Sequence, residues 1–384
     1  MTRDARCLLA VQAARAVVYG LGSIVIGVSL EQSGLSTTQV GLVFTAMLAG
    51  AALASIVLAR YGDRIGRRRC YRCLLVLMAA AGTAFALTHS LPLLILAALT
   101  GTVSADIVES GPFTSLEQAM LPHAAGDVDA TRLFGTYNTV ATIAGSLGAL
   151  TAFVASSRLW LLAYPVAAAI ALLVTVWLSV RVEVGHELDR DPLPPLHRSR
   201  GIVARMSALF ALDSFGGGFV VQSFIAYWFA LKFDTTHQEL AILFLAIGFL
   251  QAASFQIAVR LAGRIGLLRT MVFTHLPSNV LLAAIAFAPS FAVAVVLLLA
   301  RYALSQMDVP ARQAYVAAVV DPSERTAAAA YTNTARYATR PVGPLVGGAT
   351  LTIALGAPFV IAGVVKSVYD VAFYAMFRRV DTET

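Results

Sequence analysis

The segment "LWLLAYPVAAAIALLVTVWLSV" (Leu159–Val180) contains no charged residue. A helix crosses a bilayer with about 20 mostly apolar residues, so this segment is long enough to span a membrane. The whole chain is 58% hydrophobic and 13% charged, whereas soluble domains are about 45–50% apolar and about 25% charged. The sequence therefore predicts a multi-pass membrane protein.

Charges and turn residues divide the chain into twelve apolar segments. The expected spans are residues 8–30, 38–59, 70–88, 92–116, 133–155, 159–181, 204–230, 238–260, 270–288, 291–315, 325–352 and 357–377. The polar stretch Arg181–Arg200 separates six from six. We expect an all-α membrane fold with twelve transmembrane helices in two pseudo-symmetric six-helix bundles around a central cavity. The bundles cover 1–181 and 204–384, and a cytoplasmic linker covers 182–203.

Most arginines fall in alternate loops and in the linker. Short loops rich in Lys and Arg stay in the cytoplasm, so we expect both termini inside and the protein in the cell membrane. The net charge of +7 then reports topology, and the expected environment is the lipid bilayer rather than nucleic acid. The N-terminus carries Arg15 in its apolar stretch and shows no clear cleavage site, so it is interpreted as a first span rather than a signal peptide.

The two halves repeat each other. Arg64-Ile65-Gly66 recurs 200 residues later as Arg264-Ile265-Gly266. Asn138 and Asn333 differ by 195 positions, as do Gln118-Ala119 and Gln313-Ala314. Matches in the same order indicate parallel six-helix repeats, an arrangement that transporters use.

The stretch "ARYGDRIGRR" (Ala59–Arg68) resembles the loop signature between the second and third helices of the major facilitator superfamily. The matching residues are Ala59, where the family usually has Gly, and Asp63, Arg64, Gly66, Arg67 and Arg68. "GPLVGG" (Gly343–Gly348) resembles an element of the twelve-helix drug–proton antiporters. It lies here in the eleventh span instead of the fifth, and the antiporter arginine of the fourth helix is missing. The resemblance implies a monomeric secondary transporter that works by alternating access.

Charged residues inside the spans are the candidate site. A charge at the bilayer centre costs at least about 2.5–3.5 kcal/mol, so it faces a cavity or a partner. The resemblance implies that the first, fourth, seventh and tenth helices line the cavity, and most of these charges fall there. We predict that the groups binding substrate or protons are Asp106, Glu109, Arg301, Asp308 and Gln222. Asp106 and Glu109, three residues apart, would share a helix face. The alternative is that these charges only form ion pairs between helices.

A second set of residues is predicted to gate the cytoplasmic side. It consists of Asp63, Arg64, Gly66, Arg67, Arg68, Glu117, Arg312, Asp213 and Arg15. By the resemblance, Asp63 would dock on the eleventh helix, for which Asp321 is the expected N-cap. Lys366 and Asp370, four residues apart on the last span, are expected to pair with each other.

The sequence favours proton-coupled efflux of a small organic solute. The alternatives are proton-coupled uptake of a metabolite and efflux of a metal ion or metalloid; a sensor or lipid transporter is the remaining possibility. No nucleophile–base pair, nucleotide loop or histidine ligand spacing is present, so we expect no enzyme, cofactor or metal site. Cys70 and Cys73 form a single CxxC, which with Cys7 is weak support for metal binding.

Overall fold

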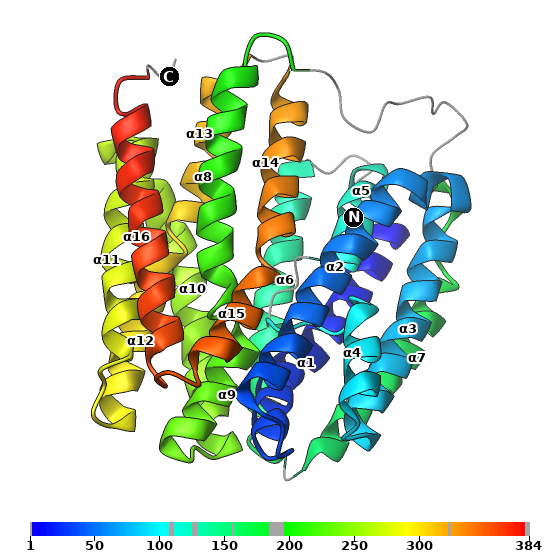
Figure 1. Ribbon diagram of the computed structural model, residues 1–384. Coiled ribbons are helices and arrows are strands. Elements are labelled where there is room, and N and C mark those ends of the chain that lie inside the picture. Colours follow the sequence, from blue (N-terminus) through cyan, green and yellow to red (C-terminus); the bar gives the residue numbers. More distant parts are fainter. Residues whose placement is uncertain are drawn as a thin grey trace. The chain divides into compact units, whose positions relative to one another are not determined.

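The computed structural model describes residues 2–106, 111–124, 130–155, 157–183, 196–321 and 324–380, which form helices and connecting turns without a strand (Figure 1). The helices of the first half are α1 (Arg3–Glu31), α2 (Thr37–Ile65), α3 (Arg67–Leu87), α4 (Leu91–Leu99), α5 (Pro112–Ala124), α6 (Ala130–Thr151), the 3-10 helix η1 (Arg158–Leu162), α7 (Ala163–Thr175) and the 3-10 helix η2 (Val180–Val182). Those of the second half are α8 (Arg200–Gly218), α9 (Gln222–Phe233), α10 (His237–Ile265), α11 (Leu267–Ile285), α12 (Phe291–Ser305), α13 (Asp308–Val319), α14 (Arg325–Thr339), α15 (Val342–Thr350) and α16 (Ala357–Phe377).

These helices group into twelve spans when interrupted spans are counted once. The fourth, seventh, tenth and eleventh spans consist of α4 with α5, α8 with α9, α12 with α13, and α14 with α15. Eight described helical segments are long and apolar enough to cross a membrane by length and composition. The prediction of an all-α membrane fold is confirmed.

The fourth span differs from the prediction, because α4 ends at Leu99 and residues 100–106 are not helical. Gly101 has a φ of +67°, which an L side chain rarely adopts. A methyl group on Gly101 would also overlap the backbone of Gly50 on α2. The prediction of one continuous helix over 92–116 is therefore wrong, and α5 begins anew at Pro112, a residue suited to a first helical turn.

The chain folds into two compact units. The first comprises Met1–Pro192 and Val221–Gly248, and the second comprises Leu193–Val220 and Phe249–Thr384. The seventh span is divided between the two units. The chain passes from the second unit to the first at Val220–Val221, where α8 and α9 are interrupted. The division into 1–181, 182–203 and 204–384 stays a prediction.

Glycines bring helices together within each unit. In the first unit, a methyl group on Gly148 of α6 would overlap the carbonyl group of Val17 on α1, and one on Gly20 would overlap Gly145. In the second unit, Gly218 of α8 meets the backbone of Arg340 and Gly343 in the same way. Gly145 and Gly148 in the first unit and Gly343 in the second thus serve equivalent contacts, of the first span with the fifth and of the seventh with the eleventh.

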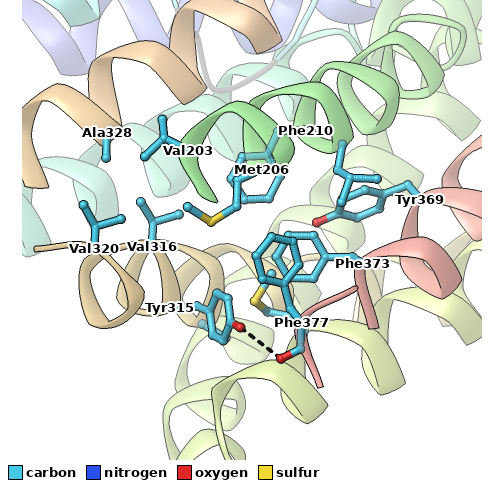
Figure 2. Packing of buried hydrophobic residues seen from close by; sticks show 13 residues of the cluster. Val203, Met206, Phe210, Tyr315, Val316, Val320, Ala328, Tyr369, Phe373 and Phe377 are labelled. Atoms are coloured by element: carbon cyan, nitrogen blue, oxygen red, sulfur yellow. Dashed lines mark hydrogen bonds between the residues drawn. The ribbon is translucent and has the colours of Figure 1, made fainter. Parts of the chain in front are cut away.

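An aromatic core fills one part of the second unit (Figure 2). Phe373 of α16 stacks on Phe210 of α8, with ring centroids 5.7 Å apart, and on Phe377 at 4.7 Å. Tyr315 of α13 packs edge-on against Phe373 at 5.7 Å and donates a hydrogen bond of 3.5 Å to the carbonyl oxygen of Phe377. Tyr369 packs against Phe210 and Phe373. It also contacts His275, one of the buried polar residues described next.

Candidate functional site

A network of charged side chains lies buried in the second unit, with Asp213 of α8 at its centre. Lys366 of α16 donates a hydrogen bond to the Asp213 carboxylate. Arg312 Nη1, from α13, lies 3.7 Å from Asp213 Oδ2, and His275 Nε2, from α11, lies 3.8 Å from Oδ1. All four side chains are at least nine-tenths buried. The structure thus brings the predicted gate residues Asp213 and Arg312 together.

The network continues from His275 to the last helix. His275 Nδ1 lies 2.9 Å from Asp370 Oδ1, and Asn279 Nδ2 donates a hydrogen bond of 2.8 Å to Asp370 Oδ2. Lys366 binds Asp213 rather than Asp370 in this arrangement, so the prediction that Lys366 and Asp370 mainly pair with each other is wrong. The imidazole of His275 instead joins two carboxylates from different helices.

The other end of the network is Asp308, whose Oδ2 accepts a hydrogen bond of 2.9 Å from Arg312 Nη1 within one turn of α13. The guanidinium of Arg312 lies 5.6 Å from the ring centroid of Phe210, and the ring of His275 lies edge-on to Tyr369 at 5.9 Å. The aromatic core therefore covers the charges on one side. Because these surroundings have a low dielectric constant, the energy of each charge depends strongly on the charges beside it.

The first unit buries a smaller cluster around Glu117 of α5. Arg15 Nη2, from α1, lies 2.5 Å from Glu117 Oε2, and both side chains are fully buried. Tyr137 of α6 donates a hydrogen bond of 2.5 Å to Glu117, and Tyr71 of α3 donates a second. The Arg15 guanidinium also lies 4.2 Å from the ring centroid of Phe113. Glu117 and Arg15, both predicted gate residues, are therefore partners of each other.

Arg301 of α12 differs from these paired cations. It is 7% exposed, and its Nε and Nη1 atoms have no hydrogen-bond partner within the described residues. Its guanidinium lies 4.7 Å from the ring centroid of the adjacent Tyr302. Ser305, one turn further along α12, is 8% exposed, and its hydroxyl also lacks a partner there.

Asp106 lies in the irregular part of the fourth span and caps another helix. Its Oδ1 accepts a hydrogen bond of 3.0 Å from the backbone N–H of Gln222, the first residue of α9. The carbonyl oxygen of Ala105 accepts another of 2.9 Å from Ser223 N–H. A carboxylate at a helix N-terminus is favoured by the exposed amides and the helix dipole. Since Asp106 is not on a helix, it does not share a helix face with Glu109, which lies outside the described residues.

The side chains of Ala59, Arg60 and Asp63 in the predicted gate loop lie outside the described structure. Gly66 ends α2 with a φ of +101°, and Arg64 is exposed. Glu183 accepts hydrogen bonds from the backbone N–H groups of Arg67 (2.7 Å) and Arg68 (3.2 Å) at the start of α3. Arg67 Nη1 donates to the carbonyl oxygen of Ala119 on α5 at 2.8 Å. The loop is therefore fastened to the polar linker and to α5.

A groove of about 550 Å³ runs between α11 and α16, with an almost wholly apolar lining. Asn279 lies in its wall, and the Oδ1 atom of Asn279 has no hydrogen-bond partner in the described structure. The groove thus reaches a member of the charged network.

The residues that sequence reasoning missed are His275, Asn279, Tyr71, Tyr137 and the role of Glu183. A signal was available for the first two, because His275 and Asn279 stand one turn apart in the apolar segment "MVFTHLPSNV". Two polar side chains at this spacing inside a span face the same neighbour. Among the described residues, no group of three or more His, Cys, Asp or Glu side chains is placed to hold a metal ion.

Comparisons with known proteins agree with this architecture. The chain is 25% identical over 430 residues to the uncharacterized membrane protein YJR124C of Saccharomyces cerevisiae, covering all of this chain and 96% of that protein. The structure of the nucleoside transporter NupG matches with a TM-score of 0.79 at 15% identity, over 98% of this chain and 100% of NupG. The D-xylose–proton symporter matches with a TM-score of 0.76 at 14% identity, over 99% and 98% of the two chains.

The family model of the Major Facilitator Superfamily matches residues 8–300, about three quarters of the chain. This match extends from α1 through most of α12, and so includes the loop signature and the cluster around Glu117. The family is one of membrane transporters rather than enzymes, and its members carry small molecules. The chain belongs to the Major Facilitator Superfamily.

Proposed function

We propose that the protein is a secondary active transporter that exports a small organic solute across the cell membrane in exchange for protons. The observation that carries this proposal is the position of His275 between Asp213 and Asp370. Histidine is the side chain that changes charge close to neutral pH. A proton taken up by His275 would add a positive charge between these two carboxylates.

Protonation of His275 would redistribute the partners of Asp213. That carboxylate is already shared by Lys366 and Arg312, so a third cation competes with both. Because the network is buried, such competition is not screened by water. Lys366 and Arg312 lie on different helices from His275, and a change in their partners shifts α13 and α16 relative to α8. This is how proton binding would alter the state of the transporter.

Asp308, which we predict to bind substrate or protons, contacts Arg312 of this network. The related folds named above belong to a nucleoside transporter and a sugar–proton symporter, and both of their solutes are small organic molecules. We place both termini and the basic linker in the cytoplasm and treat the transporter as a monomer. Uptake by proton symport would use the same histidine, so the direction must come from the assay.

The test is proton flux in proteoliposomes that contain a pH-sensitive dye. Organic anions, cations and neutral solutes are supplied on one side, and His275→Gln is compared with the wild-type protein. His197→Gln is the matched control, because His197 is exposed and contributes its backbone N–H to the contact with Glu324. We expect His275→Gln to lose solute-driven proton flux while it retains exchange of labelled for unlabelled solute. Proton flux that survives in His275→Gln would assign the network a structural role.

The sign of the flux decides the direction. In antiport, protons enter the compartment that loses the solute, and its pH falls. In symport, protons leave that compartment together with the solute, and its pH rises. The same recording therefore separates the proposed antiport from uptake.

A further inference from the structure

We infer that the transported solute is an organic anion, and that Arg301 and Ser305 of α12 bind its carboxylate group. The inference rests on the proposed function, since it names the class of solute that this transporter carries. It is drawn from three features of the second unit: an unpaired buried cation, a hydroxyl beside it, and a surplus of positive charge.

Arg301 is a buried cation that has no counter-charge among the residues that the structure describes. The nearby Arg312 contacts two carboxylates, and Lys366 contacts one. Arg301 forms no ion pair with a described residue, although it is 7% exposed, and two of its nitrogens have no hydrogen-bond partner there. Native proteins rarely leave buried charged donors unsatisfied, and such groups mark a site for a missing partner.

Ser305 adds a second hydrogen-bond donor to the site, which favours a ligand group that accepts hydrogen bonds. It stands four residues after Arg301, so the two side chains lie on one face of α12. Both present unsatisfied donors. A guanidinium offers two parallel N–H groups that fit the two oxygens of a carboxylate, and a serine hydroxyl can donate to one of these oxygens. A quaternary or primary amine would find no acceptor pair of this kind.

The charge of the surrounding helices points the same way. Within α8 and α11–α16, the described side chains that are buried or half-buried comprise four cations and three carboxylates. The cations are Arg301, Arg312, Arg336 and Lys366, and the carboxylates are Asp213, Asp308 and Asp370. A positive surplus inside a membrane is costly. An anionic solute offsets it, whereas a neutral solute leaves it unchanged and a cationic one increases it.

An anionic solute also suits exchange with protons. Export of an anion and entry of a proton both carry positive charge inward. A membrane potential that is negative inside therefore drives both movements, with about 2.3 kcal/mol per charge for each 100 mV. We accordingly expect transport to accelerate when such a potential is imposed on the proteoliposomes.

The first test needs no knowledge of the solute. Purified protein without added solute is unfolded by heat, and Arg301→Met is compared with Arg312→Met. Because Arg301 forms no ion pair with a described residue, Arg301→Met is expected to unfold at the same temperature as the wild-type protein or higher. Arg312→Met removes a paired cation and is expected to unfold at a lower temperature. A loss in Arg301→Met as large as that in Arg312→Met would overturn the inference.

The second test measures binding with matched pairs of probes. These are phenylacetate with phenylacetamide, gluconate with glucose, and succinate with succinamide. We expect at least one carboxylate to raise the unfolding temperature of the wild-type protein while its neutral partner does not. Arg301→Gln should weaken that binding by at least about tenfold, as loss of a charged hydrogen-bond pair predicts, and Arg301→Lys should fall between. Arg205→Gln, at an exposed position of α8, is the control and should bind normally.

Two results would contradict the inference in this test. One is that no carboxylate of the set binds the wild-type protein, and the other is that Arg301→Gln binds it as well as the wild type does. Failure of the proposed function looks different. In that case, carboxylates bind and are lost in Arg301→Gln, but their movement produces no proton flux in the wild-type protein.

Discussion

Arg15 and Glu117 form a buried ion pair between the first and fourth spans, and the second repeat carries the same pair with its charges reversed. Glu117 and Arg312 are 195 positions apart, the offset that also relates Asn138 to Asn333. Arg312 of the tenth span meets Asp213 of the seventh span at 3.7 Å. Equivalent helices are thus joined by an ion pair in both repeats. The cation lies on the first span in one repeat and on the tenth span in the other. The first pair is completed by tyrosines, whereas the second is extended by His275, Lys366 and Asp370.

The first prediction concerns the Arg15–Glu117 pair. Glu117→Gln keeps the size of the side chain but removes the carboxylate that contacts the buried guanidinium of Arg15. We expect it to lower the free energy of unfolding by about 3–5 kcal/mol. The double variant Arg15→Met, Glu117→Gln should recover most of this loss, because no unpaired charge remains.

Unfolding in detergent by a chemical denaturant measures both effects. The pair of Arg198 with Asp321, at 3.3 Å, is the control because the Arg198 side chain is 85% exposed, and Arg198→Gln should cost less than about 1 kcal/mol. If the double variant lost as much stability as the two single variants together, the two side chains would act independently of each other.

The second prediction concerns the pH dependence of stability and rests on Glu324. Its carboxylate accepts backbone hydrogen bonds from His197 (2.6 Å), Arg198 (3.0 Å) and Ser199 (2.8 Å) before α8. These bonds, that of His197 foremost, lower the pKa of Glu324 from 4.5 to about 2. The folded state therefore gains stability from the ionised carboxylate above the unfolded-state pKa, and loses it as the pH falls from about 5 toward about 2.

Thermal unfolding of the wild-type protein and of Glu324→Gln across this pH range provides the measurement. The variant should unfold at a lower temperature at pH 7, and the difference should shrink as the pH falls. A difference that stays constant from neutral to acidic pH would mean that ionisation of Glu324 does not stabilise the fold.

The third prediction concerns the contact of α1 with α6. Gly148→Ala places a methyl group against the backbone carbonyl of Val17, and neither helix backbone can yield easily. Overpacking of this kind costs about 1–3 kcal/mol. Gly263→Ala on α10 is the control, because nothing lies within 4 Å of the added carbon. The unfolding temperature of the control should equal or exceed that of the wild-type protein, and equal losses in the two variants would contradict the close contact.

The fourth prediction separates the two roles of Asp106. Asp106→Ala removes the cap of α9 and should cost about 0.5–2 kcal/mol, while Asp106→Asn keeps an oxygen that can accept the N–H of Gln222 and should cost little. If Asp106 acts only as a cap, Asp106→Asn transports solute like the wild-type protein. If it also binds substrate or protons, Asp106→Asn remains stable but loses solute-driven proton flux. Unfolding and flux are measured on the same preparation.

The class of fold could be predicted because its physical signals are strong and local. They are apolar runs long enough to span a membrane, arginines in alternate loops, and the repeated Arg-Ile-Gly. Each can be recognised in the sequence without knowing how the helices pack. The start of the eleventh span was less well predicted. Asp321 was the expected cap, but α14 begins at Arg325, and Glu324 uses its carboxylate on the segment before α8.

The site was predicted less completely, because partner choice depends on how helices pack. Lys366 and Asp370 satisfy the spacing rule for one helix, yet within the bundle Lys366 reaches Asp213 on α8 and Asp370 reaches His275 on α11. Asp106 was placed on a continuous helix, although Thr100 and Gly101 are residues that favour a turn. Asp213 and Asp308, charges that the sequence placed inside spans, are buried, but the sequence did not identify their partners.

The two-part composition of the first unit has a consequence for the order in which the protein is made. That unit includes Val221–Gly248 as well as Met1–Pro192, and Phe224 of α9 packs against Phe44 of α2 with ring centroids 6.0 Å apart. The first six spans therefore leave the ribosome before the helix that completes their packing exists. Until α9 is complete at Phe233, the surface around Phe44 that receives it stays uncovered by its own chain, so we expect the surrounding lipid or an insertion factor to shield it.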